Sequence, residues 1–139
     1  MSLEAAREHL DLATEQWNRA ATHAWEPSDP ASCVTNVFYA YENLIVAVAE
    51  AKNLPWAKSH YKKADLAAEL AQKKVLSKDL HDEILRLNDL RKDVSYGEPG
   101  EELSDEGLED LVGGLELMIT EVAEIVTVLE EASEERADE

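Results

Sequence analysis

Apolar residues recur every three or four positions over most of the chain, which is the spacing of an amphipathic helix. The pattern predicts five helices, over residues 2–24, 29–53, 57–74, 77–96 and 104–130. It is strongest in the last segment, where apolar residues from Leu108 to Leu129 follow one face. It is weakest in the third, whose apolar stripe is Tyr61, Ala64, Ala67, Ala68 and Ala71. Long amphipathic helices with short connections favour an all-α, up-down bundle of four to five helices.

The residues between these segments are of types that commonly begin or end helices. Pro27 and Pro30 separate the first two helices, and Pro55 follows the second. Ser77 is placed to begin the fourth helix, and Gly97 and Gly100 flank the break before the fifth. With 139 residues, we expect one domain over 1–130 and an acidic, frayed tail over 131–139.

Cysteine and hydropathy patterns place the protein among cytoplasmic proteins. Cys33 is the only cysteine, so no intramolecular disulfide can form, and we expect it to be a packing residue. The amino-terminal residues lack the order of a signal peptide, and no apolar run approaches the roughly 20 residues of a membrane span. We therefore expect a cytoplasmic protein without a membrane partner.

The net charge of −18 is unevenly distributed. Residues 98–139 hold 16 acidic side chains against Arg136 alone, whereas residues 1–97 hold 15 acidic and 12 basic ones. Between Lys52 and Lys78, seven lysines face two acidic residues. Nucleic-acid binding by the whole surface is disfavoured, but a local basic patch that includes Lys62 and Lys63 could still bind an anion.

Arg91 is the most unusual position in the apolar pattern. It follows Leu80, Ile84 and Leu87 at helical spacing, and a buried guanidinium must be paired because a buried unpaired charge costs several kcal/mol. Three alternatives are open. Arg91 could line a functional cleft, it could pair with a carboxylate such as Glu42, or Leu90 could take the core position with Arg91 at its border.

Three short segments carry a resemblance to a known family. They are Phe38-Tyr-Ala-Tyr-Glu-Asn-Leu44, Lys58-Ser-His60 and Leu87-Asn-Asp-Leu-Arg-Lys-Asp-Val-Ser-Tyr-Gly97. The stretch from Val37 to Gly97 resembles the HEPN superfamily (higher eukaryotes and prokaryotes nucleotide-binding). The resemblance implies a four- to five-helix bundle that forms a homodimer. In active members an Arg-x4-6-His motif from each subunit cleaves RNA without a metal.

Carried onto this chain, the resemblance assigns Arg91 to hold a phosphate. Tyr96 stands where the histidine would handle protons, and a phenol with a pKa near 10 is a poor base at neutral pH. Arg91 and Tyr96 are therefore the catalytic candidates if the protein is active. The further candidates are expected to contact a ligand: Lys92, Asp93, Glu42, Lys62 and Lys63.

The remaining candidate residues add no cofactor chemistry. The resemblance implies that His60 is a capping or packing element, and the other histidines read as surface or core residues. No metal-ligand or phosphate-loop motif occurs, so we expect no cofactor and no metal.

Three functions follow. The first is a HEPN-like protein that binds RNA or a nucleotide in a dimeric cleft. The resemblance implies a toxin-like role and a nucleotidyltransferase-type antitoxin as partner for it, and the missing motif histidine counts against ribonuclease activity. The second is a non-catalytic HEPN-like interaction protein in which Arg91 and Tyr96 are structural or hold a ligand. The third is a non-enzymatic, acidic helical adaptor whose last helix docks a basic partner.

Overall fold

The computed structural model describes residues 2–24, 29–95 and 105–137. It contains five helices and no strand within these residues. Their bounds are α1 Leu3–Ala24, α2 Pro30–Ala51, α3 His60–Gln72, α4 His81–Ser95 and α5 Asp105–Ala137. The prediction of an all-α helical bundle is confirmed.

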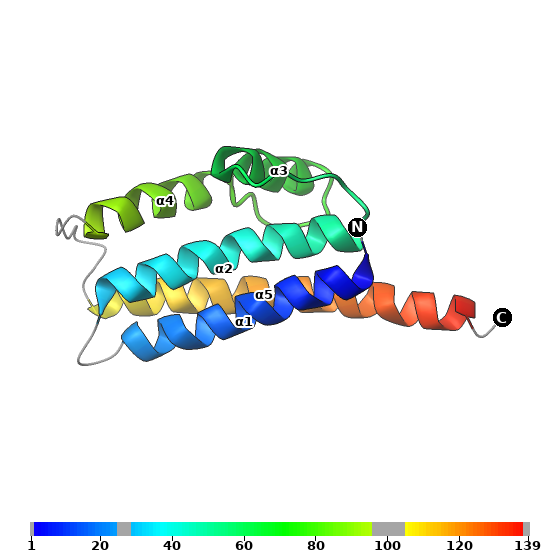
Figure 1. Ribbon diagram of the computed structural model, residues 1–139, viewed down its shortest axis with the longest axis horizontal. Coiled ribbons are helices and arrows are strands. Elements are labelled where there is room, and N and C mark those ends of the chain that lie inside the picture. The colour runs from blue at the N-terminus through cyan, green and yellow to red at the C-terminus, as the bar shows by residue number, and fades with distance from the viewer. Residues whose placement is uncertain (1, 25–28, 96–104, 138–139) are drawn as a thin grey trace.

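Helix α2 is the centre of the bundle. It packs against each of the other four helices, most extensively against α1. Figure 1 shows α1, α2 and α5 lying side by side, with α3 and α4 above α2. Helices α2 and α5 run in the same direction in this view, whereas α1 and α4 run the opposite way. Because so many neighbours cover it, every residue of α2 from Leu44 to Glu50 is buried.

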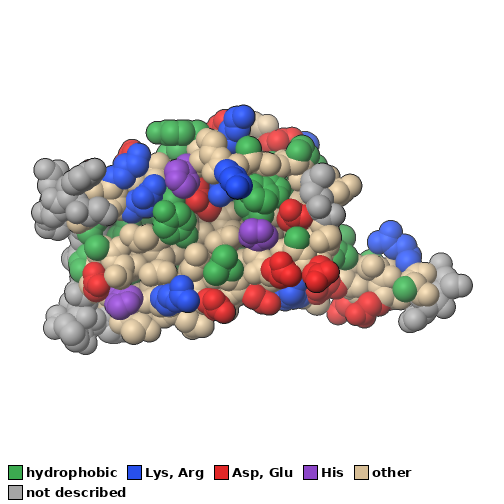
Figure 2. All heavy atoms as spheres, viewed as in Figure 1, with side chains coloured by type: hydrophobic (Ala, Val, Ile, Leu, Met, Phe, Trp, Pro, Cys, Tyr) green, Lys and Arg blue, Asp and Glu red, His purple; other side chains and the backbone are tan. Residues whose placement is uncertain are grey.

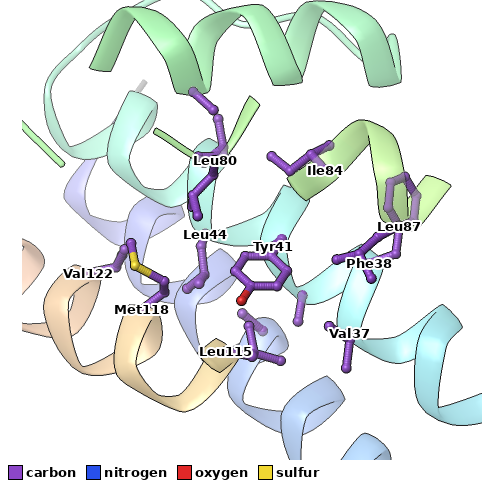
Figure 3. Close-up of a cluster of buried hydrophobic side chains, with 14 of the residues drawn as sticks. Val37, Phe38, Tyr41, Leu44, Leu80, Ile84, Leu87, Leu115, Met118 and Val122 are labelled. Carbon is purple, nitrogen blue, oxygen red and sulfur yellow. The ribbon is translucent and has the colours of Figure 1, made fainter. Parts of the chain in front are cut away.

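The core is continuous across all five helices, and one part of it lies between α2, α4 and α5. Figure 3 shows Tyr41, Leu44, Ile84 and Leu115 converging from these three helices. Leu44, Ile84 and Leu115 are fully buried, and Tyr41 is 3% exposed. Cys33, on the same central helix, is also fully buried, and this burial raises the pKa of its thiol to about 11. A protonated, enclosed thiol is a packing residue, as the sequence predicted.

Local bonds explain where two of the helices begin. At α2, the Asp29 carboxylate accepts the Ser32 backbone N–H at 3.2 Å, and Pro30 occupies the first turn. At α3, the Ser59 hydroxyl accepts the Lys62 backbone N–H at 3.4 Å. The third helix therefore begins at His60, three residues later than the apolar pattern suggested.

Three further sequence expectations differ from the structure. Helix α4 begins at His81 and not near Ser77, because the Ser77 backbone N–H and hydroxyl donate to the Glu121 carboxylate on α5. Tyr61 is 60% exposed, because Leu66 and Leu70 offer more apolar area than the alanines and set the buried face of α3. Helix α5 continues past Glu130 to Ala137, through glutamates and alanines that favour helix.

Candidate functional site

Arg91 lies at the edge of the core and not inside it. Leu87 and Leu90 are buried, with Leu90 at 7% exposure, whereas Arg91 is half-buried. This is the arrangement in which Leu90 takes the core position and Arg91 borders it. A guanidinium at such a border keeps its charge and can be reached from solvent.

Side chains from three helices surround the Arg91 guanidinium. Its Nε donates to Asn88 Oδ1 at 3.0 Å, one turn earlier on α4. Its Nη2 lies 3.5 Å from His60 Nε2 on α3. Its Cζ lies 4.9 Å from the centre of the Phe38 ring and 5.6 Å from that of Tyr39, both on α2. These contacts fix the plane of the guanidinium through hydrogen bonds and cation–π attraction.

A buried carboxylate lies behind the histidine. Glu42 is 3% exposed, and its Oε2 lies 2.6 Å from His60 Nδ1. Its other oxygen lies 3.7 Å from Lys63 Nζ. A buried carboxylate needs such partners, because burying it alone would be costly. His60 also meets the Phe38 ring edge-on, with 5.2 Å between ring centres.

The hydrogen bond to Glu42 fixes the tautomer of His60. A carboxylate only accepts hydrogen bonds, so Nδ1 carries the proton at this contact. In the neutral ring Nε2 is then an acceptor, and it faces a guanidinium that only donates. Glu42, His60 and Arg91 therefore form one connected chain of polar contacts, which continues to Asn88.

The spacing of these residues along their helices brings them together. Phe38 and Glu42 are four residues apart and share one face of α2. Ser59 caps α3 and so places His60 in the first turn, which lies against that face. Asn88 and Arg91 are three residues apart on α4. The site is thus assembled where the first turn of α3 and the last turns of α4 meet on α2.

The structure brings together some of the predicted ligand residues and leaves others apart. Glu42 and Lys63 belong to this polar chain, whereas Lys92 and Asp93 are exposed on α4. Lys62 is exposed and lines a separate shallow pocket of about 350 Å³ with Trp56 and others. Tyr96 lies outside the described residues.

Sequence reasoning missed two members of the site. His60 was expected to be a capping or packing element; Ser59 provides the cap, whereas His60 packs edge-on against Phe38 and also bonds to Glu42, which was not expected. Asn88 is 1% exposed and was not singled out. A signal for Asn88 exists, because it lies on the same helical face as Arg91, next to the buried Leu87.

The charge on this side of the molecule is divided. Figure 2 shows Lys and Arg side chains and a histidine over α3 and α4, with acidic side chains among them, whereas acidic side chains predominate along α1 and toward the end of α5 that extends past the bundle. The α3–α4 region includes Lys58, Lys62, Lys63 and Arg91. Helices α3 and α4 together hold five Lys and Arg against six Asp and Glu, so an anionic ligand would depend on direct contact with the Arg91 guanidinium and not on a net positive field.

No family model, no curated protein and no solved structure matches the chain. Within residues 2–24, 29–95 and 105–137, no helix is both long and apolar enough to cross a bilayer. In the same part of the chain, no three His, Cys, Asp or Glu side chains are grouped so that they could hold a metal ion.

Proposed function

We propose that this bundle is a HEPN-like protein that binds RNA or a nucleotide through a phosphate held at Arg91. The observation that carries the proposal is the half-buried guanidinium of Arg91, fixed by Asn88 and His60 and resting on two aromatic rings. A guanidinium presents five donors in a planar fork that matches phosphate oxygens. Partial burial strengthens such a charge–phosphate contact, because less water screens it.

The surroundings of Arg91 favour a ligand that carries a base as well as a phosphate. Tyr39 is half-buried beside the guanidinium and has a ring on which a base could stack. Lys63, 15% exposed, and the more exposed Lys62 add positive charge on α3, and the exposed Lys58 lies just before that helix. A single-stranded RNA combines phosphates with unstacked bases, so it fits both features.

The family resemblance extends the proposal to the assembly. A homodimer would bring two Arg91 residues to one cleft, and a nucleotidyltransferase-type antitoxin is the partner that the resemblance implies. Sedimentation of the purified protein measures its oligomeric state directly. A dimer whose interface excludes α4 would leave phosphate binding at Arg91 possible but would contradict the shared cleft.

The test is the binding of a labelled, mixed-sequence single-stranded RNA, followed by fluorescence anisotropy at low salt. Arg91→Ala should weaken binding about ten- to a hundredfold, the loss expected for charged hydrogen bonds. Arg91→Lys should recover only part of it, because a lysine keeps the charge but loses the planar fork. The matched control is Arg136→Ala, an exposed arginine near the extended end of α5.

Equal affinities for the wild type, Arg91→Ala and Arg136→Ala would overturn the proposal. The salt dependence gives a second measure. Removing a phosphate contact at Arg91 should make the plot of affinity against salt less steep, whereas Arg136→Ala should leave its slope unchanged.

A second function is favoured by the shape of α5. Its last turns extend past the bundle, and Glu131, Glu134 and Glu135 are exposed there. Such an end could dock a basic protein as an acidic adaptor. Shortening the chain after Glu130 should abolish binding of a basic partner but leave RNA binding at Arg91 intact, so the two functions can be separated.

A further inference from the structure

The Glu42–His60 pair supplies chemistry that the Arg-x4-Tyr sequence does not. We propose that His60 is the proton-transferring catalytic residue of this site, that Glu42 positions it, and that the protein thereby cleaves the RNA it binds. The proposal rests on the proposed binding of RNA at Arg91. It moves the proton-transfer role from the end of α4, where Tyr96 replaces the expected histidine, to the first turn of α3.

A buried carboxylate, Glu42, holds the His60 ring in place. The ring Nδ1 donates at 2.6 Å to a carboxylate that is only 3% exposed, and the second oxygen of that carboxylate faces Lys63. A buried acceptor of this kind fixes the tautomer and the orientation of the ring, and it stabilises the imidazolium that forms when the ring takes up a proton. The Phe38 ring edge restricts the imidazole further.

The other ring nitrogen of His60, Nε2, lies on the side of the ring that faces Arg91. The His60 side chain is 35% exposed, so a ligand can approach it. Its Nε2 is the acceptor nitrogen and lies 3.5 Å from Arg91 Nη2, a long contact for a hydrogen bond. Because this contact is long, a phosphate bound to the guanidinium would lie beside His60 Nε2 and could compete with it for the Arg91 donor, which would leave Nε2 to accept a proton. A general base must be within hydrogen-bond reach of the proton that it removes, and this arrangement meets that condition.

The chemical step follows from these positions. His60 Nε2 takes the proton of the ribose 2′-hydroxyl, and the 2′-oxygen attacks the adjacent phosphorus. A new bond forms between phosphorus and the 2′-oxygen, and the bond between phosphorus and the 5′-oxygen breaks. The 5′-oxygen leaves with a proton from water, and the imidazolium later returns its own proton to solvent. Arg91 stabilises the negative charge that builds on the phosphate oxygens.

His81 provides a matched contrast within the chain. It also lies in the first turn of a helix with carboxylates nearby, since its Nδ1 is 2.8 Å from Asp82 and its Nε2 is 3.5 Å from Asp65. Both carboxylates are largely exposed, and His81 precedes Arg91 by ten residues, about 15 Å along α4. It therefore has the same chemical groups as His60 but neither the buried anchor nor the neighbouring arginine.

The experiment compares binding and cleavage of one labelled single-stranded RNA in the presence of a metal chelator. The wild type should produce fragments with 2′,3′-cyclic phosphate ends, and an RNA with 2′-deoxyribose throughout should bind without being cut. His60→Gln can keep the hydrogen bond to Glu42 but cannot take up a proton. It should slow cleavage about 10²- to 10⁴-fold, a much larger loss than its loss of RNA affinity, because proton transfer contributes on that scale. His81→Gln should change neither.

Two further variants separate catalysis from folding. His60→Ala should regain part of its cleavage when free imidazole is added, an effect that a purely structural histidine would not give. Glu42→Gln should bind RNA but cleave more slowly, with the acidic limb of its pH–rate profile displaced from that of the wild type. An unchanged profile would show that Glu42 does not position the base.

The outcomes distinguish this proposal from the one on which it rests. RNA that binds through Arg91 but is not cut by the wild type, or is cut equally by His60→Gln, overturns the catalytic role of His60 and leaves the binding function in place. An RNA that does not bind to the wild type overturns both.

Discussion

Two glutamates on α2 make a natural comparison between two regions of the molecule. Glu42 is 3% exposed and Glu50 is 9% exposed, and they lie about two turns apart on the same helix. Glu50 accepts hydrogen bonds from the Trp56 indole at 2.9 Å and from the Ser2 backbone N–H at 2.8 Å. Glu42 contacts His60 and Lys63, which both lie in the first turn of α3.

The difference indicates what each carboxylate does. Around Glu50, an indole and a backbone amide tie the start of α1 and the connection after α2 to the end of α2, which is a structural role. Around Glu42, the contact leads through a half-exposed imidazole to Arg91. A buried carboxylate is by itself weak evidence of function, and the groups that follow it decide between the two readings.

The largest loss of stability is expected at Phe38, which is fully buried and also contacts both Arg91 and His60. Phe38→Ala should lower the free energy of unfolding by about 3–5 kcal/mol, because a fully buried ring leaves a cavity. It should also weaken RNA binding, since the ring supports Arg91 and His60. Leu44→Ala, one further buried position on α2, should destabilise by about 2–5 kcal/mol without a comparable loss of binding. Denaturant unfolding and anisotropy measure the two effects, and equal losses of affinity would remove Phe38 from the site.

The two glutamates can be compared by the same substitution. Glu42→Gln and Glu50→Gln should each destabilise the fold by about 1–3 kcal/mol, because each weakens hydrogen bonds to a charged, buried acceptor. Cleavage of RNA should fall in Glu42→Gln alone. If Glu50→Gln slowed cleavage as much as Glu42→Gln, the distinction between a structural and a functional carboxylate would be wrong.

Acid titration tests whether the charge of Glu50 stabilises the fold. The hydrogen bond from Trp56, with that from Ser2, holds the pKa of Glu50 below its ordinary value of 4.5. A lowered folded-state pKa stabilises the fold fully above the ordinary value, and this stabilisation is lost as the pH falls through the lowered pKa. The difference in unfolding free energy between wild type and Glu50→Gln should therefore shrink from neutral pH to about pH 3. A constant difference would show that the charge of Glu50 contributes nothing.

The smallest effect is expected at a carboxylate outside both regions. Glu130 on α5 bonds to Arg7 on α1, and the Arg7 guanidinium holds the pKa of Glu130 below its ordinary value. Both side chains are about one-third exposed, so water screens the pair. Glu130→Gln should cost about 0.5 kcal/mol or less in denaturant unfolding. A loss as large as that of Glu50→Gln would mean that burial does not set the contribution of these carboxylates.

Much of the fold was predictable because helix periodicity reports directly which residues are buried. The stripe on α2 from Val34 to Val48 is buried as expected, as are Leu108, Leu115 and Val126 on α5. The apolar pattern is weak on α3, where it consists mostly of alanines. The predicted buried face of that helix therefore wrongly included Tyr61, which is exposed. Ser77 could not be assigned correctly, because its partner Glu121 is distant in sequence.

The site was predictable only in part for the same reason. Helical spacing placed Arg91 at the border of an apolar face, and it allowed Leu90 to take the core position. It could not show that His60, 31 residues earlier, lies against Arg91. That contact depends on how the connection after α2 directs α3 toward the end of α4, and local spacing holds no information about such a packing angle.

The central claim is that a phosphate-bearing ligand binds where His60 meets Arg91. It is tested most directly by NMR of the histidine side chains, with the four imidazoles assigned from single substitutions, as single-stranded RNA is added. The His60 imidazole resonances should move on RNA addition, those of His81 should not, and the movement should be lost in Arg91→Ala. An RNA that binds while the His60 resonances remain unchanged would contradict it.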